Sequence, residues 1–245
     1  MNETDKANEI DKEIRESNAL RIYNRIRYLQ NVFYIYERNY KELETTLTTF
    51  RTPEIIIPFF DEKKGDDFNI LINELRRYFH NYVASAATLR SHAQIIIPEA
   101  YNPSEFFTEY QNKVDIEFKY EPLSVFVQDL RNYTLHRSLP ATYSQIQFHQ
   151  NEQTKQSMPT ARAYLDKESL LQGYDKWTRA SKKYLAEAPD EIDLSDLINN
   201  HHDKFASFYN WLNNRLNEIH SDELLWLQTK SNELRMILEP IFKQS

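Results

Sequence analysis

Residues 66–97, DDFNILINELRRYFHNYVASAATLRSHAQIII, decide the fold class that the sequence predicts. Apolar side chains return every three or four positions along the whole stretch, which is the spacing of an α-helix with one apolar face. Asp66 and Asp67 are predicted to cap this helix, and Pro98 is predicted to end it. The apolar stripe consists of Leu71, Leu75, Tyr78, Phe79, Tyr82, Ala86, Leu89, Ala93 and Ile97.

Further helices are predicted on both sides of this one. Residues 5–50 carry the same periodicity over a length that leaves room for one break. A shorter helix follows Ser104, and another runs from near Pro122 until Pro140 stops it. Additional C-terminal helices are predicted over residues 166–240.

The segment at residues 141–165 has a different pattern. ATYSQIQFHQ, residues 141–150, alternates with a period of two and is followed by the polar residues 151–156. We expect a two-stranded β-hairpin in which Pro159 confines its strand to an edge. The predicted fold is therefore an all-α single domain, residues 1–245, with a small inserted hairpin.

Composition excludes several classes of function. The chain has 245 residues, two glycines and no cysteine. Glycine-cradled phosphate sites, disulfides, thiolate zinc sites and cysteine nucleophiles are therefore not expected. The net charge of -7 argues against a protein that coats DNA through a broad basic surface. With neither a long apolar run nor a signal-like N-terminus, we expect a cytoplasmic protein with no membrane segment.

The candidate site lies in QDLRNYTLHRSLP, residues 128–140. On a helical wheel the core face centres on Leu130, and Arg131, Asn132 and His136 occupy the opposite arc. Two apolar side chains, Leu135 and Val125, are interleaved with them on that arc. A solvated face would be polar throughout, so we expect another segment or a second subunit to cover this arc.

These three residue types suit the handling of a phosphodiester without a metal. His136 lies in the last helical turn, where the helix dipole favours an imidazolium that donates a proton. Asn132 precedes it by one turn and is placed to orient the ring. Arg131 offers a rigid fork of donors that matches phosphate oxygens.

The spacing Arg-x4-His in RNYTLH, with an asparagine directly after the arginine, resembles the motif of the HEPN family. The resemblance covers residues 66–140 closely, with the helix of residues 5–50 added to the bundle. It implies a four-helix up-and-down core and a homodimer in which two motif copies meet. Many members of that family are metal-independent endoribonucleases of toxin–antitoxin, phage-defence and CRISPR systems. Others have lost catalysis and bind RNA or proteins.

Carried over to this chain, the resemblance assigns roles to the motif residues. Arg131 would contact the scissile phosphate, His136 would transfer a proton at the 2′-hydroxyl or the leaving oxygen, and Asn132 would support both. The reaction would be transesterification of RNA to a 2′,3′-cyclic phosphate, with no cofactor or metal.

Two alternatives stay open at this point. Arg77, His80 and Asn81 share a face of the helix at residues 66–97, and they are either part of an RNA-binding cleft or a packing surface. The whole protein is either an RNA-directed enzyme or a non-catalytic helical module that holds a partner protein such as an antitoxin. A metal site at residues 201–203, HHD, is not favoured, because three consecutive residues of a helix point in different directions.

Overall fold

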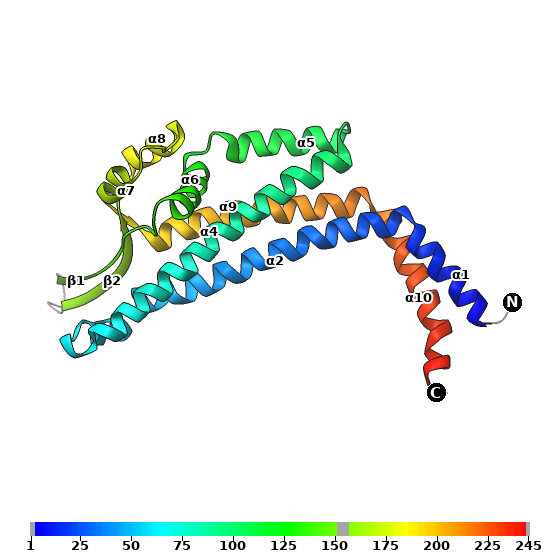
Figure 1. Ribbon diagram of the computed structural model, residues 1–245, viewed down its shortest axis with the longest axis horizontal. Coiled ribbons are helices and arrows are strands. Elements are labelled where there is room, and N and C mark those ends of the chain that lie inside the picture. Colours follow the sequence, from blue (N-terminus) through cyan, green and yellow to red (C-terminus); the bar gives the residue numbers. More distant parts are fainter. Residues whose placement is uncertain (1–2, 151–156, 244–245) are drawn as a thin grey trace. The chain divides into compact units, whose positions relative to one another are not determined.

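The computed structural model describes residues 3–150 and 157–243 and shows a mostly helical chain with a small sheet inserted in its middle (Figure 1). The helices before the sheet are α1 (Glu3–Glu16), α2 (Asn18–Arg51), α3 (Pro53–Ile56), η1 (Ile57–Phe60), η2 (Glu62–Lys64), α4 (Gly65–Tyr101), α5 (Glu105–Val114), η3 (Asp115–Lys119) and α6 (Pro122–His136). The later elements are β1 (Thr142–Gln150), β2 (Ser157–Asp166), α7 (Lys167–Gly173), α8 (Arg179–Glu187), β3 (Glu191–Asp193), α9 (Leu194–Ile219) and α10 (Ser221–Lys243). The predicted fold class, long helices with an inserted hairpin, is confirmed.

The hairpin is part of a three-stranded antiparallel sheet in the order β1-β2-β3. The prediction that Pro159 confines its strand to an edge is wrong, because β2 is the central strand. Pro159 faces Phe148 of β1, whereas β3 pairs only with the far end of β2, from Tyr164 to Asp166. The proline is tolerated because the second ladder does not reach it. The predicted connection at residues 151–156 lies outside the described residues.

Three predicted helix boundaries need correction. Pro98 does not end its helix, since α4 continues for almost one more turn and the Pro98 carbonyl accepts a hydrogen bond from Asn102 N (3.1 Å). Asp66 and Asp67 lie inside the first turn of α4, after an N-cap at Lys64. The motif helix α6 ends at His136, four residues before Pro140.

The predicted break in the N-terminal helix is confirmed at Ser17. Its hydroxyl donates to the Ile14 carbonyl (2.7 Å) and accepts from Leu20 N (3.0 Å). One side chain therefore serves the last turn of α1 and the first turn of α2.

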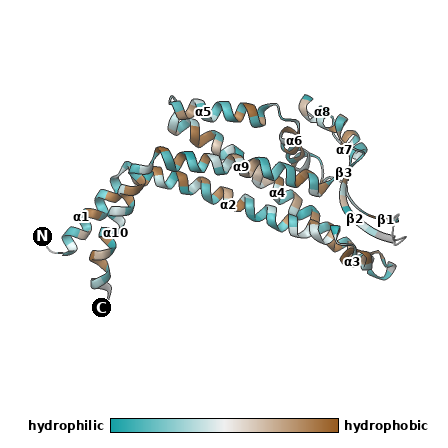
Figure 2. Cartoon of the chain, turned by 180° about the vertical axis from the view of Figure 1, so that it is seen from behind, coloured by the Kyte–Doolittle hydropathy of each residue, from teal (hydrophilic) through white to brown (hydrophobic). Residues whose placement is uncertain are grey.

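The chain packs as two compact units. The smaller unit combines residues 1–31 with residues 207–245, and its buried side chains include Ile22, Ile26 and Leu212. The larger unit, residues 32–206, contains α3 to α8, the sheet and parts of α2 and α9. Apolar and polar residues are interspersed along the long helices, as expected for amphipathic helices (Figure 2).

A buried polar network lies within the larger unit, between α2, α4 and α9. The Tyr82 hydroxyl lies 2.6 Å from His201 Nδ1 and 3.1 Å from the Tyr36 hydroxyl. All three side chains are almost completely removed from solvent. Burial raises the pKa of Tyr82 well above its ordinary value and lowers the pKa of His201 to about 3. Tyr82 and His201 are thus kept neutral, and their polar atoms are hydrogen-bonded to neighbours.

The neighbouring His202 has a separate set of contacts. Its Nε2 lies 2.8 Å from the Glu37 carboxylate, and its ring stacks on Tyr40 with 3.5 Å between ring centroids. His201 and His202 therefore point to different partners. Among the described residues, no three His, Asp or Glu side chains form a cluster suited to a metal ion.

His201 gives the stability of the fold a defined pH dependence. The pKa of an unfolded histidine is 6.5 and burial lowers that of His201 to about 3, so between these values only the unfolded chain binds the proton. Stability therefore falls as the pH falls through this window. On going from about pH 7 to about pH 5, we expect the wild type to lose about 2 kcal/mol of unfolding free energy that a His201→Gln variant does not lose. Urea unfolding at both pH values measures this difference, and equal losses in the two proteins would contradict it.

Candidate functional site

The inner face of the motif helix α6 is covered by α8 and the segment that precedes α8. The ring of Phe126 stacks on Tyr184 of α8, with 4.5 Å between centroids, and lies 5.5 Å from the ring of Trp177. Phe126 is fully buried, as are most of the side chains predicted to form the core face of this helix. The helix α4 also packs against α6. The position of α6 is therefore fixed by neighbours from both earlier and later parts of the chain.

A buried carboxylate, Asp129, joins α6 to the N-terminus of α8. One of its oxygens, Oδ2, accepts hydrogen bonds from Thr178 N (2.9 Å) and from the Ser181 hydroxyl (2.6 Å). A negative charge at a helix N-terminus is favourable because unpaired N–H groups and the helix dipole converge there. Sequence reasoning missed Asp129, since its partners are 49 and 52 positions away.

Tyr133, inside the motif itself, is held from several sides. Its ring stacks on Trp177 at 5.8 Å and meets Tyr174 edge to face at 5.6 Å. Its hydroxyl accepts a hydrogen bond from Ser138 (3.1 Å). A Cβ on Gly173 would lie 3.0 Å from this hydroxyl, so a larger residue there would require the Tyr133 ring to shift by a few tenths of an ångström.

The opposite arc of α6 carries the predicted catalytic residues. Arg131 and Asn132 are half-buried, and His136, the last residue of the helix, is exposed. Two apolar side chains beside them are also open to solvent, Leu135 at 47% and Leu139 at 48% exposure. The arc predicted to be covered is thus only partly covered by its own chain.

The structure brings the three motif residues onto one and a half turns of helix, without joining them in one hydrogen-bonded cluster. Arg131 Nη1 donates to Asn132 Oδ1 over a long 3.4 Å. In the part of the chain that the structure describes, Asn132 makes no hydrogen bond to His136, so the expected orientation of the ring by Asn132 is not seen. Arg131 likewise has no ion pair with a carboxylate among these residues. Its guanidinium is therefore available to an anion.

The start of α6 is also fixed electrostatically. Glu121 caps the helix by accepting from Ser124 N (2.7 Å), and it forms an ion pair with Lys204 of α9 (2.6 Å). Burial alone would raise the pKa of Glu121, but the hydrogen bonds from Lys204 and Ser124 outweigh it and lower that pKa. The cap stays ionised at neutral pH.

The predicted substrate-binding residues lie on α4, which packs against α6. Arg77 is exposed, forms an ion pair with Glu74 (2.6 Å) and lies over the ring of Tyr78 (4.1 Å). His80 and Asn81 are half-buried, and the buried Nδ1 of His80 has no hydrogen-bond partner among the described residues. Neither hydrogen bonds nor ion pairs within the described chain join this set to Arg131, Asn132 or His136.

In the described part of the chain, no helix is both long and apolar enough to cross a bilayer.

Loss of the Asp129 carboxylate is expected to loosen the support of α6. In Asp129→Ala, Thr178 N and the Ser181 hydroxyl lose a buried acceptor, which costs about 2 to 3 kcal/mol of unfolding free energy. In Asp129→Asn the amide oxygen still accepts, so the loss is expected to be about 1 kcal/mol. Urea unfolding of both variants measures the difference. An Asp129→Ala variant as stable as the wild type would show that this contact does not hold α6.

Comparison of the chain with protein-family models, with curated proteins and with solved structures finds no match. The likeness to the HEPN motif thus remains a resemblance carried by residues 131–136.

Proposed function

We propose that the protein is a cytoplasmic, homodimeric, HEPN-like protein of a defence or toxin–antitoxin type system that binds RNA and cleaves it without a metal. One observation carries the proposal: Arg131, Asn132 and His136 lie on a half-open arc of a helix whose other side is fixed. A rigid helix with a partly exposed arginine and histidine provides an anion-binding group and a proton-transfer group at fixed separation.

The chemistry needs a base, an acid and a cation. A neutral His136 would take the proton of an RNA 2′-hydroxyl, whose oxygen then forms a bond to the adjacent phosphorus. The bond from phosphorus to the 5′-oxygen breaks, and that oxygen takes a proton from a second, protonated imidazole. Arg131 would stabilise the charge on the non-bridging phosphate oxygens. The products are a 2′,3′-cyclic phosphate and a free 5′-hydroxyl.

A two-fold dimer supplies the second imidazole. Arg131 and His136 are five residues apart and so about 140° apart around one helix, which leaves a single copy poorly arranged to surround a phosphate. Across a two-fold axis the arginine of one subunit would face the histidine of the other. Leu135 and Leu139, exposed beside the motif, support such an interface because they provide apolar area to bury.

The residues of α4 would extend this site. His80 would contact RNA through the part of its side chain that is open to solvent, since its Nδ1 is buried. Asn81 lies beside it, half-buried. Arg77 would reach a phosphate only by leaving Glu74, so we expect it to contribute less to binding than Arg131.

A non-catalytic module that holds a partner protein is the second candidate. The observation that favours it is the missing hydrogen bond between Asn132 and His136, together with the exposed Leu135 and Leu139, which suit a protein surface.

The ribonuclease proposal is tested with purified protein and mixed cellular RNA in EDTA. We expect the wild type to cleave and to leave 2′,3′-cyclic phosphate ends, and Arg131→Ala and His136→Ala to lose at least about a hundredfold in rate. Arg137→Ala is the matched control, since Arg137 is an exposed cation directly after the helix and outside the motif. Cleavage that persists in both motif variants, or a wild type that neither binds nor cleaves RNA, would leave the interaction module as the better assignment.

The dimer is tested by light scattering. We expect a particle of twice the 29.4 kDa of one chain. Leu135→Asp places a charge in the proposed interface and is expected to weaken the dimer about thirtyfold or more. Ile116→Asp, at an 80% exposed position on η3 before the other end of α6, is expected to leave it intact. A wild-type monomer at all concentrations would contradict the composite site.

A further inference from the structure

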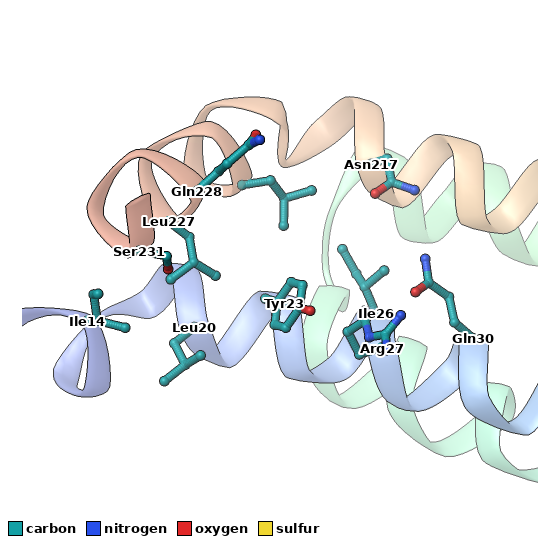
Figure 3. A pocket seen from close by; sticks show the side chains of 11 residues that line it. Ile14, Leu20, Tyr23, Ile26, Arg27, Gln30, Asn217, Leu227, Gln228 and Ser231 are labelled. Carbon is teal, nitrogen blue, oxygen red and sulfur yellow. The ribbon is translucent and has the colours of Figure 1, made fainter. Parts of the chain in front are cut away.

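The smaller unit contains a groove between two helical segments, α1–α2 and α9–α10, where each segment is interrupted. The break between α1 and α2 is at Ser17, and the break between α9 and α10 is at His220. The two helical segments run antiparallel, as the contacts from Lys6 to Glu233 (3.2 Å) and from Gln30 to Asn213 (2.7 Å) show. Because both helical segments change direction in the same region, their side chains do not fill the space between them (Figure 3).

The groove has the size and lining of a small-molecule site. It encloses about 490 Å³, within the range of about 300 to 1,000 Å³ that is usual for ligand pockets. Its apolar lining is provided by Ile14, Leu20, Ile26, Leu224 and Leu227. A second cavity of about 530 Å³ shares Ile14 and Ser231 with the first and adds Leu234 and Leu238. The apolar track thus continues along α10.

One end of the groove carries a cation and two amides, while Gln228 and Ser231 lie nearer its other end. Figure 3 shows Arg27, Gln30 and Asn217 at one end, and Ile14, Leu20 and Leu227 toward the other. The amides of Gln30 and Asn217 are held by hydrogen bonds to Asn213, through its side chain and its carbonyl respectively (2.7 Å each). This end therefore presents a guanidinium next to positioned amides.

Arg27 is an exposed arginine of the lining that forms no ion pair with a described residue. Of the other charged residues along the two cavities, Asp11 pairs with Arg15 (2.7 Å) and Arg235 lies 3.9 Å from Glu239. Arg27 makes no ion pair within the described residues, and no acidic residue occurs between residues 17 and 36. One uncompensated cation at the end of an apolar track is complementary to an apolar chain with one anionic head.

We propose that this groove binds a single-chain amphiphile with an anionic head group, such as a medium- or long-chain carboxylate. The head would lie at Arg27, Gln30 and Asn217, and the chain would follow Leu224 and Leu227 toward Leu238. Leu224 and Leu238 are 14 positions apart, which corresponds to about 21 Å along a helix, enough for an extended alkyl chain. This inference is independent of the ribonuclease proposal, because the residues that line the groove include none from α4 or α6.

Calorimetric titration of the full chain with decanoate and with decyltrimethylammonium, both below micelle-forming concentrations, tests the proposal. The two probes share a ten-carbon chain and differ in head charge. We expect one saturable decanoate site, with at least about tenfold weaker binding of the cationic probe. Dodecanoate is expected to bind about threefold to fourfold more tightly for each added methylene.

Variants locate the site. Arg27→Gln is expected to weaken decanoate binding about tenfold, whereas Arg21→Gln, an exposed arginine of α2 outside the lining, is the matched control and leaves it unchanged. Leu224→Asp is expected to abolish binding, with circular dichroism confirming that both Arg27→Gln and Leu224→Asp remain folded. Equal affinity for the two head groups, or decanoate binding unaffected by Arg27→Gln, would overturn the proposal. A dimer that Leu224→Asp dissociates would overturn it too, by assigning the groove to a second copy of the chain.

Discussion

The Asp129 carboxylate is the buried contact that ties the motif helix α6 to the part of the chain that follows it. It sits on the buried face of α6 and accepts two hydrogen bonds at the N-terminus of α8. A buried carboxylate is costly unless it is hydrogen-bonded, so this contact favours the relative placement of the two helices in which both bonds form. The stacked rings of Phe126 and Tyr184 then fill the space between them. The role of the segments after α6 follows: they fix the orientation of the motif helix and determine which of its arcs stays open.

Local features of the fold were predictable from the sequence, and long-range ones were not. The long helices and the hairpin follow from apolar periods of 3.6 and 2, which depend only on neighbours in the chain. The strand β3 is three residues long and forms because β2 already offers an unpaired edge, a condition that no local pattern reveals. Pro98 misleads for the opposite reason, since a proline near the end of a long helix removes only one of many hydrogen bonds.

The same division holds for the candidate site. The wheel separated the buried side of α6, with Leu130 and Tyr133, from the side with Arg131 and His136, and burial in the structure agrees with this separation. The hydrogen bonds of Asp129 and the pairing of Tyr82 with His201 could not be derived, because they join residues 49 or more positions apart. The sequence indicates what a residue is able to bind, and the fold determines which partner it meets.

The alternation of roles along residues 130–136 has a consequence for the history of such a protein. Leu130 and Tyr133 are buried, and Tyr133 stacks on Trp177 and lies close to Gly173, so substitutions of either residue endanger folding. Arg131, Asn132 and His136 lie on the other side, where their side chains contribute little to the packing of the chain. Mutations on that side are therefore expected to be nearly neutral for stability, so that only a function of these residues would select against such mutations. A lineage relieved of that selection would keep the scaffold intact while the surface drifted toward new partners.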